Sequence, residues 1–254
     1  MQGATRRELT TALDNGEVKR IVRGWYAFRH ADQRVVTGIR AGGRVGCLTG
    51  CRLHQLWTPK HDVTHVVFGR GSELTPVPGT VLHADEGPQP SSAVWPLLDC
   101  LRHVAHRHGM EDALIVAESA LHNGLVSPDE LRGLSLPGRS SRFLRYLNRA
   151  ESGSETRVRL FLEQHGVRLL PQVEIPGVGR VDLLVGDNLI IECDSEAHHG
   201  SDRDYREDRR RDLAARDLGF DTIRLSYAQI WYQWESTKRS LLRQIRLRRH
   251  ISRT

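Results

Sequence analysis

Arg180-Val181-Asp182-Leu183-Leu184-Val185 and Leu189-Ile190-Ile191-Glu192-Cys193-Asp194 are the two stretches that decide the fold in the second half of this 254-residue chain. Both are short and apolar, and the turn residues Gly186-Asp187-Asn188 join them. This pattern predicts a tight antiparallel hairpin. The predicted strands also carry carboxylates, and Glu192 and Asp194, two residues apart, fall on one face of the second strand.

The three carboxylates Asp182, Glu192 and Asp194 are therefore expected at neighbouring ends of one sheet. Buried like charges are costly unless something compensates them, and a divalent cation is the usual compensator. Oxygen ligands of this kind suit Mg²⁺ or Mn²⁺. A hairpin with an exposed acidic face is the simpler alternative, but the neighbouring segments weigh against it.

The segments around the hairpin predict an α/β domain whose mixed sheet is flanked by helices. Ser152-Gly153-Ser154-Glu155 opens a helix before the hairpin, and the pair His198-His199 follows it. The expected elements are, in order, helix 153–165, strands 168–174, 180–186 and 189–194, helix 202–218, strand 220–226 and helix 235–249. The last helix has arginines among leucines, which a solvated face explains as well as a contact with a nucleic-acid backbone does.

Residues 152–231 resemble the nuclease-like domain-of-unknown-function family 559, which is related to the very-short-patch repair endonuclease and belongs to the PD-(D/E)xK superfamily. The matching pieces are Ser-Gly-Ser-Glu (Glu155), Arg-Val-Asp-Leu (Asp182), Ile-Glu-Cys-Asp (Glu192 and Asp194), His199, Glu-Asp-Arg-Arg-Arg-Asp (207–212) and Gly-Phe-Asp-Thr-Ile-Arg-Leu (219–225). Each piece is loose, but their order and spacing together are fairly specific. The resemblance implies a restriction-endonuclease-like core that hydrolyses phosphodiester bonds with Mg²⁺ or Mn²⁺.

The resemblance also implies a role for each matching residue. Asp182 and Glu192 would be the core metal ligands, with the Cys193 carbonyl completing the set. Glu155 would hold a metal-bound water or a second ion, although a solvated carboxylate in the first turn of a helix is the plain alternative. Asp194 would be a further ligand or an orienting group. His199, or its neighbour His198, would act as general base or protonate the leaving oxygen, unless it is only a surface histidine.

Two positions depart from the expected pattern. The superfamily commonly has lysine two residues after the glutamate, where this chain has Asp194, and the family usually has glycine where this chain has Ser195. A binding-only, inactive domain therefore stays open. Arg210 and Arg224 are expected to contact DNA, Arg224 at the scissile phosphate. The alternative for both, together with Asp208, is a salt-bridge network across the charged helix.

The first 70 residues predict a winged-helix-like DNA-binding domain. A short amphipathic helix at 5–14 precedes a basic two-stranded ribbon that ends with the strand 24–28, and Lys19, Arg20 and Arg23 would lie on or near the wing. Thr-Arg-Arg-Glu-Leu and Val-Lys-Arg-Ile-Val-Arg-Gly-Trp-Tyr-Ala-Phe resemble the N-terminal winged helix of the type IV abortive-infection antitoxin. This weaker resemblance also implies DNA binding.

Residues 71–150 are expected to form a mixed and helical connecting region. Further expected elements are a helix at 45–56, strands at 64–68 and 79–83, helices at 94–108 and 111–123, a short helix from Pro128 and another at 140–148. Pro137-Gly138-Arg139-Ser140-Ser141 is the expected internal break. The nuclease-like domain is accordingly expected to span 151–254.

Basic ends flank an acidic segment. Residues 151–229 hold 11 Arg and Lys against 16 Asp and Glu, whereas 230–254 hold 7 against 1 and the first 40 residues 8 against 4. A nuclease would set metal-binding acids beside a phosphate-attracting surface in this way, so DNA is the expected partner. Charge scatter in an arginine-rich proteome is the alternative.

The four cysteines are scattered and form no CxxC pair, which predicts reduced thiols in a cytoplasm. A zinc site on Cys47, Cys51, His54 and His61 is the less favoured alternative. The chain has no apolar run of membrane-spanning length and no secretory signal, so no membrane partner is expected. Gly-x-Ser-x-Gly and GxxxxGK[ST] motifs are absent, which argues against a serine hydrolase and against ATP use.

The sequence as a whole predicts a metal-dependent DNA endonuclease or nickase of bacterial repair or defence. A monomer with one site would nick DNA, and a homodimer could cut both strands. A non-catalytic, antitoxin-like DNA-binding regulator is the main alternative, and the presence of all three carboxylates, Asp182, Glu192 and Asp194, weighs against it. A structure-specific RNase also fits the same motifs.

Overall fold

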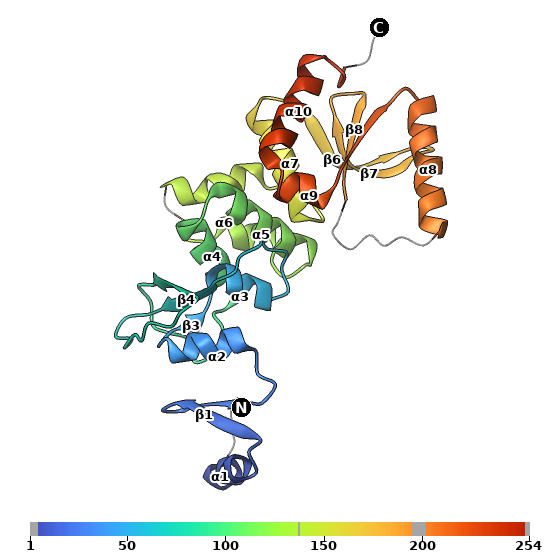
Figure 1. Cartoon of the computed structure of the whole chain (residues 1–254). Helices are drawn as coiled ribbons and strands as arrows, with labels where there is room; N and C mark the ends of the chain where they lie inside the picture. The colour runs from blue at the N-terminus through green and yellow to red at the C-terminus, as the bar shows by residue number, and fades with distance from the viewer. Residues whose placement is uncertain (1–4, 137, 195–201, 252–254) are drawn as a thin grey trace. The chain divides into compact units, whose positions relative to one another are not determined.

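The computed structural model describes residues 5–136, 138–194 and 202–251, without the side chains of 202–208. The fold is α/β, with mixed sheets flanked by helices, and this confirms the expected fold class (Figure 1). The chain forms two compact units, and both are discontinuous in sequence. Unit 1 consists of Met1–Asp112 and Asp129–Ser141, and unit 2 of Ala113–Pro128 and Arg142–Thr254. These units divide the chain differently from the expected segments 1–70, 71–150 and 151–254.

Unit 1 combines two small sheets with short helices. Its elements up to the second sheet are α1 (Arg6–Asp14), β1 (Val18–Val22), β2 (Trp25–Phe28), α2 (Gln33–Arg40), β3 (Arg44–Val45), α3 (Cys47–Leu53), β4 (Thr64–Phe68) and β5 (Thr80–Ala84). Strands β1 and β2 pair antiparallel. The second sheet has the order β3-β4-β5, in which β3 and β4 are antiparallel and β4 and β5 are parallel.

The N-terminal helix and ribbon lie close to where the sequence predicts them. Helix α1 starts after Thr5 because a capping box fixes it: Glu8 N–H donates to the Thr5 hydroxyl, and Thr5 N–H donates to the Glu8 carboxylate at 2.7 Å. Gly24, at φ +81°, makes the turn between β1 and β2. Helix α2, which the sequence reading missed, begins after Asp32, whose carboxylate accepts the Arg34 N–H at 2.8 Å.

Several helices are shorter than expected, and each has a local cause. Helix α3 begins at Cys47 rather than at residue 45 because Arg44–Val45 forms β3. Helix α4 (Leu97–Arg107) begins after Pro96, because Val94 is already engaged in a bridge with Val45. The expected helix at 140–148 is instead a 3₁₀ segment, η1 (Gly138–Tyr146). The other helices of this stretch are α5 (Met110–His122) and α6 (Pro128–Arg132).

Unit 2 is built on a four-stranded sheet with the order β6-β7-β8-β9. Its elements after α5 are α7 (Gly153–Gln164), β6 (Leu169–Ile175), β7 (Gly179–Val185), β8 (Leu189–Cys193), α8 (Asp202–Asp217), β9 (Asp221–Leu225), α9 (Tyr227–Trp231) and α10 (Trp234–Arg246). Strands β7 and β8 form the predicted antiparallel hairpin, with Val185 opposite Leu189. Strand β9 returns parallel to β8, after the crossover through α8.

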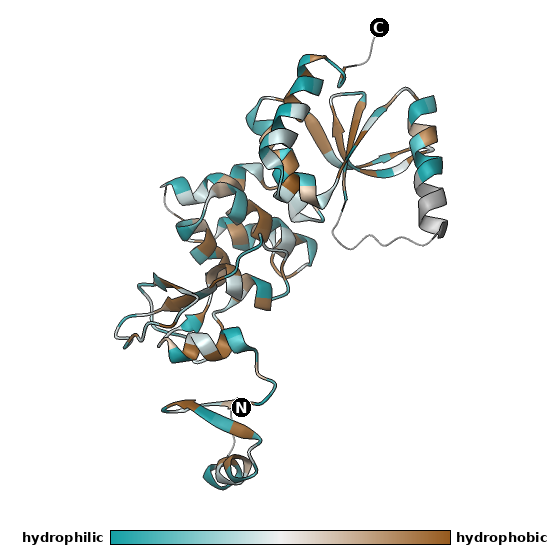
Figure 2. Ribbon diagram, viewed as in Figure 1, coloured by the Kyte–Doolittle hydropathy of each residue, from teal (hydrophilic) through white to brown (hydrophobic). Residues whose placement is uncertain are grey.

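Helices cover both faces of this sheet (Figure 1). Helices α7, α9 and α10 pack against one face around Leu183, Ile191 and Leu241, and α8 packs against the other around Ile190 and Ala215. The strands are accordingly apolar along most of their length (Figure 2). Within the described part of the chain, no helix is both long enough and apolar enough to cross a membrane.

A buried ion pair explains why most of α5, from Ala113 onward, belongs to unit 2 rather than to an earlier domain. Arg159 of α7 is 0% exposed and pairs with Glu118 of α5, which is 1% exposed. Glu118 also accepts the Thr156 hydroxyl at 2.7 Å and the Asn148 N–H at 2.8 Å. A buried charge must be paired, so these bonds hold α5 against the start of the sheet domain.

Candidate functional site

Three of the predicted carboxylates come together beside β7 and β8, the two inner strands of the unit 2 sheet. Glu155 comes from the first turn of α7, where the Ser152 hydroxyl caps the helix, Asp182 from β7 and Glu192 from β8. The Asp182 N–H lies 3.2 Å from the Glu192 carboxylate, and the Cys193 N–H donates to the Asp182 carboxylate at 2.8 Å. Neighbouring backbone groups therefore fix both strand carboxylates.

Gln172 of β6 joins Glu155 to this pair, and the sequence reading missed it. Its side-chain N–H₂ donates to Glu155 at 2.7 Å and lies 3.5 Å from Asp182. The residue has φ +52°, in the left-handed region that an L-residue rarely adopts. Its amide oxygen is buried and has no hydrogen-bond partner. Strained backbone and an unpaired buried oxygen are features that cluster at functional sites.

The electrostatics of the three carboxylates follow from burial and from their proximity. Burial, followed by the Asp182 charge, raises the pKa of Glu155 above its usual value. Burial also raises the pKa of Asp182, against the opposing bond from the Cys193 N–H. For Glu192, burial and then the Asp182 charge raise the pKa to about 7. Each group resists ionisation, which is expected where like charges meet in a partly desolvated site.

Arg211 of α8 is a cation that faces this site, whereas the sequence predicts a functional role for its neighbour Arg210. Its guanidinium lies 3.3 Å from the Glu192 carboxylate and also donates to the backbone carbonyls of Val178 and Arg180. Arg210, which the sequence selected, lies 3.4 Å from the Gly177 carbonyl on the exposed surface. Helical spacing explains the difference, because adjacent residues of a helix point about 100° apart.

The remaining predicted residues of unit 2 have different outcomes. Arg224 is half-buried and pairs with Asp212 at 2.8 Å, as the salt-bridge alternative anticipates. It stands opposite Glu192 in the β8–β9 register. Asp194 is partly exposed, and its N–H donates to the Leu225 carbonyl at 2.9 Å. His198 and His199 lie outside the described residues, and the Asp208 side chain is not described.

The donor set fits a hard divalent cation. It consists of the carboxylate oxygens of Glu155, Asp182 and Glu192, beside the buried amide oxygen of Gln172. At Cys193 the main-chain N–H donates to Asp182, and the ligand role of the Cys193 carbonyl stays a prediction. The carboxylates are not drawn tightly together: among the described residues, only Cys47, His65, His83 and His108 form a group whose ligand atoms all lie within 4.8 Å of one another. The Gln172 amide stands between Glu155 and Asp182 and explains that spacing.

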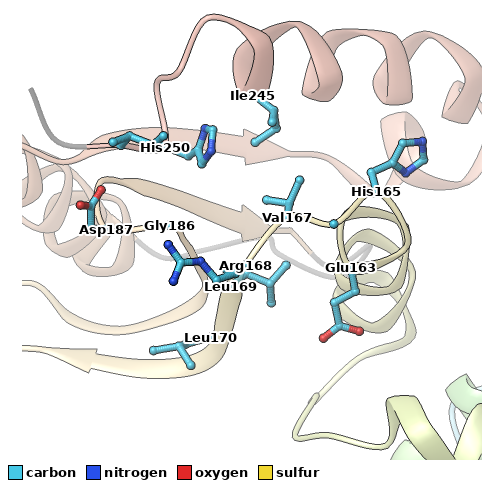
Figure 3. Close-up of a pocket in the computed structure, with 12 residues that line it drawn as sticks. Glu163, His165, Val167, Arg168, Leu169, Leu170, Gly186, Asp187, Ile245 and His250 are labelled. Atoms are coloured by element: carbon cyan, nitrogen blue, oxygen red, sulfur yellow. The ribbon is translucent and has the colours of Figure 1, made fainter.

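The predicted residues do not line the cavity of unit 2 that Figure 3 shows. This cavity of about 860 Å³ lies at the C-terminal end of α7 and beside the β7–β8 turn, between Val167 and Ile245 (Figure 3). Glu155 stands at the other end of the same helix. A second hollow, of about 590 Å³, runs along α8 and β9 and is lined by Arg209, Arg216 and Arg224 as well as by Asp212 and Asp221.

In unit 1, the basic residues of the ribbon are accessible. Lys19, Arg20 and Arg23 are all exposed on or next to β1. The zinc alternative of Cys47, Cys51, His54 and His61 does not assemble. His54 instead bonds the Trp95 carbonyl at 2.8 Å, and His61 bonds the Pro59 carbonyl and the Thr49 hydroxyl.

No family model matches the chain, and a search of the curated proteins finds no match either. The geometry of Glu155, Gln172, Asp182, Glu192 and Arg211 is therefore the basis on which a function is inferred.

Proposed function

We propose that unit 2 is a metal-dependent nuclease that hydrolyses phosphodiester bonds of DNA with Mg²⁺ or Mn²⁺. The observation that carries the proposal is the gathering of Glu155, Asp182 and Glu192, from one helix and the two inner strands of the sheet. Arg211 pairs with Glu192 at 3.3 Å, yet burial still raises the pKa of all three carboxylates above the usual values. A divalent cation would offset the remaining repulsion.

The order of elements supports the same proposal. Helix α7 is followed by the antiparallel strands β6, β7 and β8, then by α8 and the parallel strand β9. This is the order that the resemblance to the PD-(D/E)xK superfamily implies, with the acidic residues at the predicted places on β7 and β8. The resemblance is an argument by analogy, whereas the carboxylate geometry is independent of it.

Within this proposal, Asp182 and Glu192 would hold the cation, and Glu155, which Gln172 positions, would hold a metal-bound water or a second ion. When bound, the cation neutralises charge on the phosphate and lowers the pKa of the attacking water. Arg211 contributes positive charge beside Glu192, which Asp194, at the position of the superfamily's lysine, cannot supply. The Gln172 amide and the Cys193 N–H keep the carboxylates oriented.

DNA as the substrate is favoured by the basic surface near these acids. The hollow along α8 and β9 presents three arginines against two aspartates, and Arg224 stands opposite Glu192 across the β8–β9 pair. Arginines bind phosphate oxygens through two hydrogen bonds at once. The exposed Lys19, Arg20 and Arg23 of unit 1 would add contacts to the DNA backbone, which strengthen binding without reading sequence.

The test is incubation of the purified full chain with supercoiled plasmid in Mg²⁺, in Mn²⁺ and in EDTA. Asp182→Asn keeps the shape of the side chain but removes its charge, and it should abolish nicking. Asp187→Asn, in the exposed β7–β8 turn, makes the same chemical change outside the site and should nick like the wild type.

The outcomes separate the proposal from its alternatives. Metal-dependent nicking that is lost in Asp182→Asn and kept in Asp187→Asn supports the nuclease. A folded wild-type protein that shifts DNA on a gel but never cleaves it would overturn the nuclease in favour of a DNA-binding regulator. Cleavage of structured RNA but not of plasmid would overturn the choice of substrate alone.

A further inference from the structure

Unit 1 contains a second cluster of metal-ligating side chains, remote in sequence from the acidic site. Cys47, His65, His83 and His108 bring one thiol and three imidazoles together, with ligand atoms all within 4.8 Å of one another. Cys47 opens α3, His65 lies in β4, His83 in β5, and His108 directly follows α4. Four separate elements of unit 1 therefore meet at one point.

Strand pairing and the start of α3 place the four side chains of this cluster. His65 and His83 project from adjacent parallel strands, with Val66 opposite Leu82 between them, so they share one face of the sheet. Cys47 takes φ +51°, a conformation that costs an L-residue energy, and the Gly46 N–H bonds the His65 carbonyl at 3.2 Å. The Gly46 bond places the start of α3 beside His65 of β4.

The hydrogen bonding of His65, His83 and His108 leaves ring nitrogens whose lone pairs are available to a metal ion. His65 Nδ1 and His83 Nε2 face each other at 2.9 Å, so only one of them carries the shared proton. In the tautomer that carries its proton on Nδ1, His108 directs that proton toward the Asp112 carboxylate, 3.4 Å away. His108 Nε2 is then an acceptor, and it is buried without a hydrogen-bond partner. An unpaired buried acceptor is costly unless a cation meets it.

Packing confirms that the rings converge. The His65 ring centroid lies 5.2 Å from that of His83 and 5.0 Å from that of His108. Cys47 is fully buried and His65 is 4% exposed, whereas His83 and His108 are partly exposed. This is a nearly closed site with one edge near solvent, as a structural metal requires.

We propose that Cys47, His65, His83 and His108 bind one zinc ion, which holds together α3, β4, β5 and the end of α4. Three nitrogens and one sulfur form a tetrahedral, borderline-soft ligand set that prefers zinc over Mg²⁺. With Zn–N near 2.0–2.1 Å and Zn–S about 2.3 Å, the ligand atoms around zinc would stand roughly 3.3–3.6 Å apart. Small side-chain rotations that part His65 Nδ1 from His83 Nε2, now 2.9 Å apart, and draw the more distant ligand atoms together would therefore fit the ion. Asp112 is a positioning residue that acts through His108.

The test measures metal content and ligand spectroscopy on the full chain, purified without a histidine tag and without chelator. Elemental analysis of the wild type should find about one zinc per chain. After the zinc is removed, titration with Co²⁺ should give the intense visible bands of a tetrahedral site and a thiolate-to-cobalt charge-transfer band. Cys47→Ser should lose the charge-transfer band. Cys51→Ser replaces another fully buried thiol outside the cluster and should keep it.

A second variant keeps the proposal testable if Cys47→Ser does not fold. Asp112→Asn leaves all four ligands in place, and it should weaken Co²⁺ and Zn²⁺ binding roughly 10–100-fold, as loss of an outer-shell partner does. Circular dichroism checks that each protein is folded. Folded wild-type protein that takes up no Co²⁺, or a charge-transfer band that follows Cys51 instead of Cys47, would overturn the site. Neither result bears on the acidic site of unit 2, because none of these residues belongs to it.

Discussion

The His/Cys cluster of unit 1 and the acidic cluster of unit 2 both bring candidate metal ligands together, but the ligands differ in charge. Both gather side chains from several elements in a mostly buried place. In unit 1 the groups are neutral imidazoles and a thiol, and their ligand atoms already lie within 4.8 Å of one another. In unit 2 they are carboxylates, which repel one another, and the Gln172 amide and Arg211 separate and partly compensate them.

This difference shows how charge controls preorganisation. Neutral ligands can be packed close together without a cation, at the cost of unpaired lone pairs such as His108 Nε2. Anionic ligands cannot, because each lowers the tendency of the next to ionise, as the raised pKa of Glu192, about 7, shows. A preassembled site suits a structural ion that stays bound, and a looser, charged site suits an ion that arrives with a phosphate.

Metal removal should have the largest effect on stability, and it tests directly whether the two clusters differ. Removing zinc is expected to destabilise unit 1 by about 4 kcal/mol, the stabilisation that a ligand at a thousand times its Kd confers. Thermal unfolding before and after chelation measures the loss. Zinc should restore the original transition, and Mg²⁺ alone should not. Full recovery with Mg²⁺ would show that the two clusters do not differ in the way described here.

Glu192→Gln should affect only unit 2. The amide keeps the size of the side chain but removes a charged ligand, so plasmid nicking should fall at least about a hundredfold, since loss of an outer-shell partner already costs 10–100-fold. The Co²⁺ spectrum of unit 1 serves as the internal control and should not change. A variant that nicks at the wild-type rate would remove Glu192 from the site.

The two clusters should respond to pH with opposite signs in metal-free protein. The pKa of Glu192 rises from 4.5 to about 7 on folding, so the native state binds more protons between these values and stability falls as pH rises through them. Burial, reinforced by the nearby His108, lowers the pKa of His65 from 6.5 to about 3 and that of His83 to about 4. There the unfolded state binds more protons, so stability is lost as pH falls below about 6.5.

Urea unfolding at pH 5 and at pH 8 checks the unit 2 half of this prediction. Glu192→Gln should be about 1–3 kcal/mol more stable than the wild type at pH 8 and nearly equal to it at pH 5. Added Mg²⁺ should narrow the difference at pH 8, because it favours the ionised carboxylates. An equal stability difference at both pH values would mean that Glu192 keeps an ordinary pKa.

Gln172→Gly should give the smallest change in stability, and it tests whether Gln172 orients Glu155 for nicking. Glycine accepts the φ of +52° without strain but loses the bond to Glu155, so these terms nearly cancel and stability should change by no more than about 1 kcal/mol. Nicking should nevertheless fall roughly tenfold, as expected when a partner that orients a ligand is lost. Unchanged nicking would make Gln172 a purely structural residue.

Local sequence patterns predict the framework of unit 2 and the three carboxylates of its candidate site. Alternating apolar runs and the turn at Gly186 predict the β7–β8 hairpin, and residue parity puts Asp182 and Glu192 on definite faces of it. Ser152 predicts the start of α7 and therefore the position of Glu155. These features are local, and local patterns are what a single sequence carries.

Contacts between side chains that are distant in sequence could be found only in the tertiary structure. Gln172 and Arg211 reach the site from 17 residues after Glu155 and 19 residues after Glu192, and helix phase selects Arg211 over Arg210. The group Cys47, His65, His83 and His108 has no regular spacing, and it forms because parallel pairing of β4 with β5 aligns two histidines. Such contacts depend on strand register and on helix packing, which are set by long-range burial rather than by neighbouring residues.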